Sequence, residues 1–219
     1  MILWIQVLLT GFLFNCTPAT KEEVKDGGWD IVLSGKVGYP QAGEIYIQEI
    51  RQDGKVKRDT ITLRKDYSFA KRLHLSEAGF YNVNFFNRQS INLMLNKSNV
   101  ELNVDGNNQQ GFVQIKGSPD HDLISKVQMM MSQSQSGPAM MALQTEYEKA
   151  VAANDNQKVT MLQNQAIDLM DKGKADLVAL LRQEPASLAL FNILQDPNLI
   201  DKDKHADLFV TSSEKFKKD

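Results

Sequence analysis

The sequence is short of the residues that most often perform chemistry in proteins. Its 219 residues include a single cysteine, Cys16, and three histidines. Because thiol–disulfide exchange needs a pair of thiols, one cysteine excludes a C-x-x-C redox motif from these residues. The histidines His74, His121 and His205 do not have the spacing of a zinc motif, and we expect them at the surface or near helix ends.

Excess charge is absent as well. The formal net charge is −2 and no long basic stripe occurs, which argues against a nucleic-acid partner. After the N-terminus, no apolar run is long enough to span a bilayer. Asp201, Asp203 and Asp207 resemble part of a calcium loop, but the glycine and the final glutamate of such a loop are missing. The sequence therefore predicts no catalytic residue, no cofactor and no metal site in this chain.

The N-terminus is the most apolar segment. Residues 1–14 are almost wholly apolar, a length typical of the hydrophobic region of a secretory signal and too short for a membrane span. The run ends at Leu13-Phe14-Asn15-Cys16, which is similar to a lipobox, where a peptidase cleaves before a cysteine that then receives lipid. We predict a lipoprotein signal peptide over residues 1–16, lipidation of Cys16 and a linker over residues 17–28. The alternative is a cleaved secretory peptide with an incidental cysteine.

The charged residues that follow Cys16 suggest where in the cell the protein is located. Lys21-Glu22-Glu23 resembles the lysine-plus-two-acids tag that directs some bacterial lipoproteins to the outer face of the outer membrane. We accordingly expect the protein in the cell envelope, attached to the outer membrane through its lipid and either periplasmic or surface-exposed. The membrane is then one partner, reached through the lipid anchor.

Residues 29–117 show the alternation of apolar and polar residues that is typical of β-strands. In the clearest case Val100, Leu102 and Val104 alternate with polar neighbours. Turn-forming residues separate the apolar segments: Tyr39-Pro40, Asp53-Gly54, Lys65-Asp66, Asn96–Asn99 and Asp105–Asn108. Short strands with hairpin-length gaps predict an antiparallel β-sandwich or a barrel-like domain.

Residues 118–219 change to helical periodicity. The predicted starts and turns are Ser118-Pro119, Pro138 after a polar break over Gln133–Pro138, and Asn154–Asn156. Glu184-Pro185 ends the third helix, and two shorter helices follow over Leu188–Leu194 and Ala206–Phe216. The predicted fold class is therefore α+β, an antiparallel β domain followed by an all-helical segment.

Methionines are concentrated in the helical part, at Met129–Met131, Met140–Met141, Met161 and Met170. Methionine fills irregular gaps in cores and suits adaptable binding surfaces. Thioether ligands alone, on helices that also need a core, argue against a Cu(I) site. We expect core packing or a groove that faces a partner.

Several segments together resemble one known family. They are Gly35-Lys36-Val37 at the opening of a first strand, Phe80–Val83 ahead of Leu93–Leu95, Val100–Leu102, and Ile115–Ser118 at the helix start. Their order resembles the N-terminal domain of unknown function 4369 of bacterial TlpA-like thioredoxin or peroxiredoxin-type lipoproteins. The resemblance implies that the helices over 118–219 lead toward a C-terminal redox domain carrying Trp-Cys-x-x-Cys, which is missing from this sequence. It therefore brings no catalytic residue to any position here.

Two functional hypotheses result. In the first, the chain is the non-catalytic N-terminal anchoring and scaffold portion of a cell-envelope thiol–disulfide oxidoreductase, with a C-terminal redox domain as its partner. In the second, it is a stand-alone lipid-anchored binding lipoprotein for a peptide, a glycan or a partner protein, with exposed aromatics such as Tyr46 or Phe86 as anchors. The first hypothesis predicts frayed helices after Pro185, because their apolar faces would be left uncovered.

Overall fold

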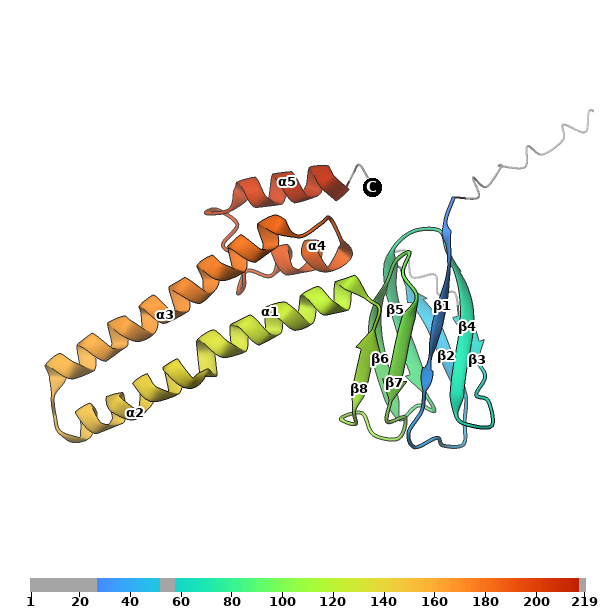
Figure 1. Cartoon of the computed structure of the whole chain (residues 1–219), viewed down its shortest axis with the longest axis horizontal. Coiled ribbons are helices and arrows are strands. Elements are labelled where there is room, and N and C mark those ends of the chain that lie inside the picture. The colour runs from blue at the N-terminus through green and yellow to red at the C-terminus, as the bar shows by residue number, and fades with distance from the viewer. Residues whose placement is uncertain (1–26, 52–57, 217–219) are drawn as a thin grey trace, which may run out of the picture.

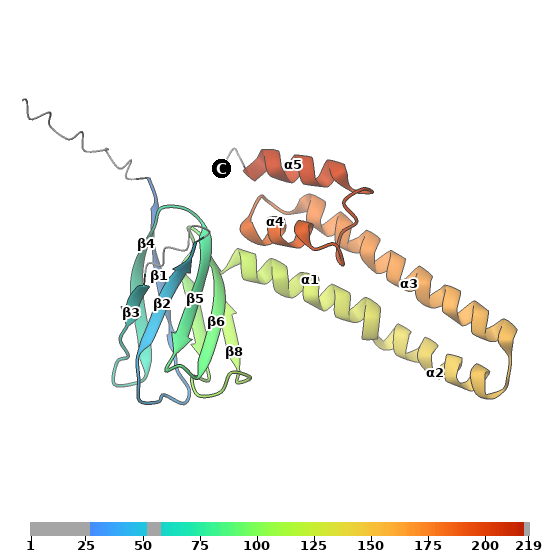
Figure 2. The same ribbon diagram turned by 180° about the vertical axis from the view of Figure 1, so that it is seen from behind.

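A computed structural model describes residues 27–51 and 58–216 as eight strands followed by five helices (Figure 1). The strands are β1 (Trp29–Lys36), β2 (Ile45–Ile50), β3 (Arg58–Ile61), β4 (Ser68–Leu75), β5 (Gly79–Phe85), β6 (Gln89–Leu95), β7 (Val100–Val104) and β8 (Val113–Lys116). They form two four-stranded sheets, a first sheet in the order β4-β1-β7-β8 and a second in the order β3-β2-β5-β6. The two sheets bury one shared apolar core, so the predicted β-sandwich is confirmed (Figures 1 and 2).

One strand pair departs from the antiparallel pattern. β1 runs parallel to β7, with Leu33 opposite Val100 and Ser34 opposite Glu101. The other strand pairs in the described ranges are antiparallel. β6 and β7 belong to different sheets, so the chain crosses between the sheets there, and the short gap between these strands is not a hairpin.

Gly35 lies near the end of β1, whereas the family resemblance led us to expect it at the opening of the strand. A Cβ atom at this position would lie 1.8 Å from the carbonyl oxygen of Leu102 on β7. A side chain does not fit in that space, so glycine is what permits the backbones of β1 and β7 to approach. The strand itself begins at Trp29, which pairs with Leu75 of β4.

The sandwich core is built from the inward residues of both sheets. The rings of Phe69 and Phe85 face each other across it, with centroids 6.1 Å apart. One amide side chain, Gln89 of β6, is fully enclosed. Its Oε1 accepts a hydrogen bond from the backbone N–H of Gly106 at 2.7 Å, and its Nε2 donates to the carbonyls of Gly111 and Phe112 at 3.3 and 3.4 Å. These bonds offset the cost of burying the amide and tie β6 to the loop between β7 and β8.

The helices are α1 (Pro119–Ser136), α2 (Pro138–Ala152), α3 (Asn156–Gln183), α4 (Leu188–Gln195) and α5 (Ala206–Phe216). Side chains cap three of them, since Ser118, Asp155 and Ser187 accept hydrogen bonds from the backbone N–H groups three residues later. The predicted helix starts at Ser118-Pro119 and Pro138, and the turn over Asn154–Asn156, are confirmed.

The predicted polar break over Gln133–Pro138 is wrong for most of its length. Gln133–Ser136 are helical, because glutamine and serine at exposed positions cost a helix little. The interruption is Gly137 alone, which has an extended backbone (φ −71°, ψ 171°) between α1 and α2. Its N–H still donates to the carbonyl of Gln133, and α2 continues roughly in the direction of α1 (Figure 1).

The helices form an arm that projects from the sandwich. α1 and α2 lie antiparallel to α3, and α4 and α5 lie over the base of this arm (Figures 1 and 2). A helical core at the base contains Leu123, Val127, Leu177, Val178, Leu181, Ala189, Leu190, Ile193, Leu194, Ile200 and Leu208. Because four of these residues belong to α4, the uncovered apolar face that we expected after Pro185 is not found for α4. Toward its tip the arm has little buried core. Ala150 is the buried residue of α2.

Asp120 joins the sandwich to the helices. It lies in the first turn of α1 and is only 1% exposed. Its Oδ2 accepts a hydrogen bond from Nδ2 of Asn96, in the turn between β6 and β7, at 2.8 Å. Its Oδ1 accepts from the backbone N–H of Ala189, in the first turn of α4, at 2.9 Å. One carboxylate thus holds a sheet loop, α1 and α4 together, at two helix N-termini that favour negative charge.

Replacing this carboxylate should destabilise the protein strongly. We expect Asp120→Ala to lower the free energy of unfolding by about 2–4 kcal/mol, because the Asn96 amide and the Ala189 N–H lose their acceptor in a buried place. Urea denaturation of the full chain, followed by circular dichroism, measures the change. Asp122→Ala is the control, an exposed acid of the same helical turn that should cost less than about 1 kcal/mol. Equal losses in the two variants would contradict this role of Asp120.

Candidate functional site

The predicted lipidation site, Cys16, lies outside the described residues. The predicted signal peptide over residues 1–16, most of the linker over residues 17–28 and the Asp53-Gly54 turn also lie outside them. In the described part of the chain, no helix combines the length and the apolarity needed to cross a bilayer.

The three histidines lie apart from one another. His121 is in the first turn of α1, and His205 precedes α5. His74 on β4 faces Asp30 on β1, with Nδ1 and Oδ1 3.0 Å apart. Within residues 27–51 and 58–216, no three histidine, cysteine or acidic side chains come together as a set of metal ligands.

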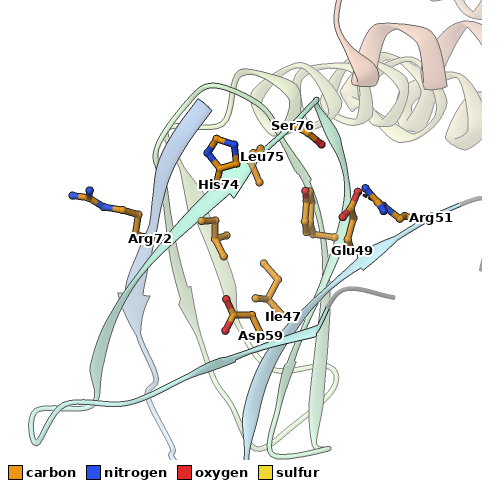
Figure 3. A pocket seen from close by; sticks show the side chains of 10 residues that line it. Ile47, Glu49, Arg51, Asp59, Arg72, His74, Leu75 and Ser76 are labelled. Carbon is orange, nitrogen blue, oxygen red and sulfur yellow. Dashed lines mark hydrogen bonds and ion pairs between the residues drawn. The ribbon is translucent and has the colours of Figure 1, made fainter. Parts of the chain in front are cut away.

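A polar pocket opens where the edge strands β3 and β4 of the two sheets diverge (Figure 3). It has a volume of about 320 Å³ and is lined by Ile47, Glu49, Arg51, Asp59, Arg72, Leu73, His74, Leu75, Ser76 and Tyr81. The ion pair between Lys71 Nζ of β4 and Asp59 Oδ1 of β3, 2.6 Å long, spans the gap between the sheets. Figure 3 shows Arg72 pointing away from the pocket, so its guanidinium does not fill the interior.

Two groups give the pocket its electrostatic character. Glu49 and Arg51 form an ion pair, with Oε1 and Nε 2.9 Å apart. Tyr81 of β5, the direct cross-strand partner of Glu49 in the same sheet, is only 8% exposed. Burial, and then the negative charge of Glu49, raise the pKa of Tyr81 to about 12, so its hydroxyl is a proton donor at neutral pH. A carboxylate, a guanidinium and a phenol in one small cavity suit the binding of a polar ligand by hydrogen bonds.

A match to a family model covers nearly all of the two sheets and the start of α1. Residues 31–124 match a protein family described as a domain of unknown function, DUF4369. No curated protein and no solved structure matches the chain. The matched DUF4369 stretch contains all ten residues of the pocket and also Asp120, whereas α2 to α5 follow it. With one cysteine in its sequence, the chain has no pair of thiols.

The aromatic anchors predicted from the sequence are partly wrong. Phe86 is buried in the sandwich core, because it follows β5 in a tight turn with left-handed backbone (φ 56°), where alternation ends. Tyr46 is half-buried on the outer face of the second sheet, with the guanidinium carbon of Arg58 3.9 Å from its ring centre. Phe80, which was not among the predicted anchors, lies on the same outer face by alternation and is 37% exposed.

The methionines divide between partly buried and exposed positions. Met131, like Met94 of β6, packs beside the helical core. Met129, Met141, Met161 and Met170 are exposed along the arm. A groove of about 220 Å³ lies between α2 and α3 and is lined by Met140, Leu143, Gln144, Tyr147, Leu162, Gln163 and Ala166. The lining of this groove carries no charged side chain.

The buried phenol of Tyr81 should make the free energy of unfolding depend on pH in the alkaline range. In the unfolded chain Tyr81 loses its proton near the ordinary pKa of 10.0, whereas the folded protein retains it up to about 12. The stabilisation is complete below the lower of these values and is lost as the pH rises through the upper one. We expect the free energy of unfolding of the wild type to fall more steeply over this range than that of Tyr81→Phe.

Urea denaturation at a series of alkaline pH values measures both slopes. Tyr39→Phe, at an exposed loop position, is the matched control and should follow the wild type because it retains Tyr81. If Tyr81→Phe shows the wild-type slope, the buried phenol does not titrate as described.

Proposed function

We propose that this chain is the non-catalytic, lipid-anchored part of a cell-envelope thiol–disulfide oxidoreductase of the TlpA-like kind. Cys16 carries the lipid, the sandwich and the helices form a scaffold, and a separate redox domain follows them. In the exchange reaction, the dithiol of that domain gives two electrons and two protons to a substrate disulfide and becomes a disulfide itself. No residue of this chain takes part in that step.

The observation that carries the proposal is the joint at Asp120, and the packed α4 beside it replaces the frayed helix that we expected for this hypothesis. A scaffold differs from a flexible linker because it holds the domain at one end in a fixed position relative to the domain at the other end. Here α4 is fixed to the sandwich through the Asp120 carboxylate, and α4 also contributes to the helical core. An ion pair 2.5 Å long, between Arg182 Nη1 and Asp207 Oδ2, fastens α5 to α3, and Leu208 is buried beneath it. The DUF4369 match and the order of the family-like segments support the same interpretation.

The two ends of the described chain constrain how such a scaffold works. The start of β1 and the end of α5 lie toward the same end of the molecule in both views (Figures 1 and 2). In this proposal the redox domain therefore stands near the anchored end of the sandwich, and the residues between Cys16 and β1 set its distance from the membrane. Those residues, 17–28, reach at most about 40 Å when fully extended.

The anchor is tested by labelling cells that express the full chain with an alkyne analogue of palmitate. We expect label on the wild type and none on Cys16→Ser, because the thioether to the lipid forms on this cysteine. A processed wild-type protein that is released into the soluble fraction without label would contradict the anchoring role and favour an ordinary secretory signal.

The scaffold role is tested by sequencing the gene beyond the codon for Asp219 and assaying the natural product for reduction of insulin disulfides. We expect the frame to reach Trp-Cys-x-x-Cys, and we expect activity that is lost when the first cysteine of that motif is replaced. Cys16→Ser, assayed in detergent, is the control and should leave the activity unchanged. A stop codon directly after Asp219 would overturn the proposal and leave a stand-alone binding lipoprotein as the better hypothesis.

A further inference from the structure

The outer face of the second sheet carries a regular grid of side chains that an anchoring role does not use. The strand register gives three rows across the sheet: Thr60-Tyr46-Asn84-Ser90, Arg58-Gln48-Asn82-Asn92 and Ile50-Phe80-Met94. These side chains point outward because their neighbours along each strand, such as Ile47, Val83 and Leu93, point into the core.

Charge is scarce on this face. Among the eleven described residues of the three rows, Arg58 is the one with a charged side chain. Arg58 is ion-paired with Glu44 and stacks on Tyr46, so its charge is compensated at the border of the grid. The outer face of the first sheet is different, since its register places Asp30, Lys36, Arg72, Glu101 and Lys116 there.

The centre of the grid is held in place by hydrogen bonds within the face. Asn82 Nδ2 donates to Ser90 Oγ and to Asn92 Oδ1, each at 2.8 Å. In the described hydrogen bonds, Asn92 uses only its carbonyl oxygen, so its two amide N–H groups remain for a ligand. The amides are thus pre-oriented, and a ligand does not have to order them on binding.

The face is also open. In Figure 2 the second sheet lies toward the viewer, and no helix of the described chain crosses it. The helices touch it only at one corner, where Met94 packs beside the helical core. At the same end of the grid, Phe80 is 37% exposed and Ile50, its partner on β2, is 51% exposed. The accessible surface therefore offers apolar area next to fixed amides.

We propose that this face binds a neutral oligosaccharide or polysaccharide. Phe80 stacks on the apolar C–H face of a sugar ring, with Ile50 extending the platform beside it, and Tyr46, whose ring Arg58 covers on one face, borders the site. Gln48, Asn82 and Asn92, in the row between the two aromatics, exchange hydrogen bonds with sugar hydroxyls. This binding does not depend on the redox scaffold role, because it uses only the sandwich.

The composition of the grid favours a glycan over other ligands. A sugar hydroxyl both donates and accepts hydrogen bonds, so it can pair with either the N–H or the carbonyl group of a side-chain amide. An apolar protein surface would instead leave these amides buried without a hydrogen-bond partner. An anionic ligand would meet only Arg58, whose charge Glu44 already compensates. Four strands and three rows cover about 14 Å by 14 Å, an area that suits several linked sugar rings.

The test uses the full chain, purified from membranes in a polyoxyethylene detergent that has no sugar headgroup. Binding is measured to an array of neutral polysaccharides (starch, xylan, mannan and mixed-linkage β-glucan), with polygalacturonate as the anionic comparison. We expect at least one neutral glycan to bind, and Phe80→Ala and Asn82→Ala each to weaken that binding about tenfold.

Two matched controls lie on the first sheet or beside it. Phe112→Ala removes an exposed phenyl ring from the loop before β8, and Asn103→Ala removes an amide that bridges Glu101 and Gln114 much as Asn82 bridges its neighbours. Each should change the affinity less than about twofold. Gln48→Ala, checked for an unchanged melting temperature, supplies a further variant if Asn82→Ala disturbs the fold, and it too should weaken binding.

Four results would overturn the proposal. They are no binding to any neutral glycan, binding to polygalacturonate alone, equal losses in the grid variants and the controls, and a self-association that Phe80→Ala abolishes while no glycan binds. The last result, read by light scattering, would assign the face to a protein interface instead. Neutral-glycan binding that is lost in the grid variants and kept in the controls supports the proposal.

Discussion

One buried carboxylate joins the sandwich to the helices. Asp120 accepts hydrogen bonds from a sheet loop and from the start of α4, and Met94 of β6 packs beside the helical core at the same junction. Typical domains are stable by only about 5–15 kcal/mol, so a contact whose loss costs a few kcal/mol is a large part of that margin.

The sandwich itself is closed by polar contacts at its two sides. Gln89 ties β6 to the loop between β7 and β8, and the Lys71–Asp59 ion pair ties β4 to β3. Gln109 also bonds through its side chain to both backbone groups of Ser90, which protects the edge of β6 from pairing with another strand. These contacts leave two surfaces for ligands, the pocket beside Tyr81 and the uncharged outer face around Asn82.

The features predicted correctly from the sequence are those with local causes. Alternation placed Val100, Leu102 and Val104 in the core, because the strand period of two is a property of the backbone. Ser118, Pro138 and Asp155 mark helix starts through caps and proline geometry that act within one turn. The predictions failed at Phe86, where a left-handed turn ends the alternation, and at Gly35, whose requirement for glycine comes from the distant Leu102 carbonyl.

The sequence by itself determined the α+β class, most element boundaries, the lack of a thiol pair, and which residues alternate onto the outer face of each strand. These follow from backbone periodicity and residue chemistry within short segments. Only the tertiary structure decided that β1 and β7 run parallel, that Asp120 meets Asn96 and Ala189, and that Tyr46, Gln48, Phe80 and Asn82 share one face. Contacts between residues so far apart in the chain depend on strand order and register, which local patterns do not specify.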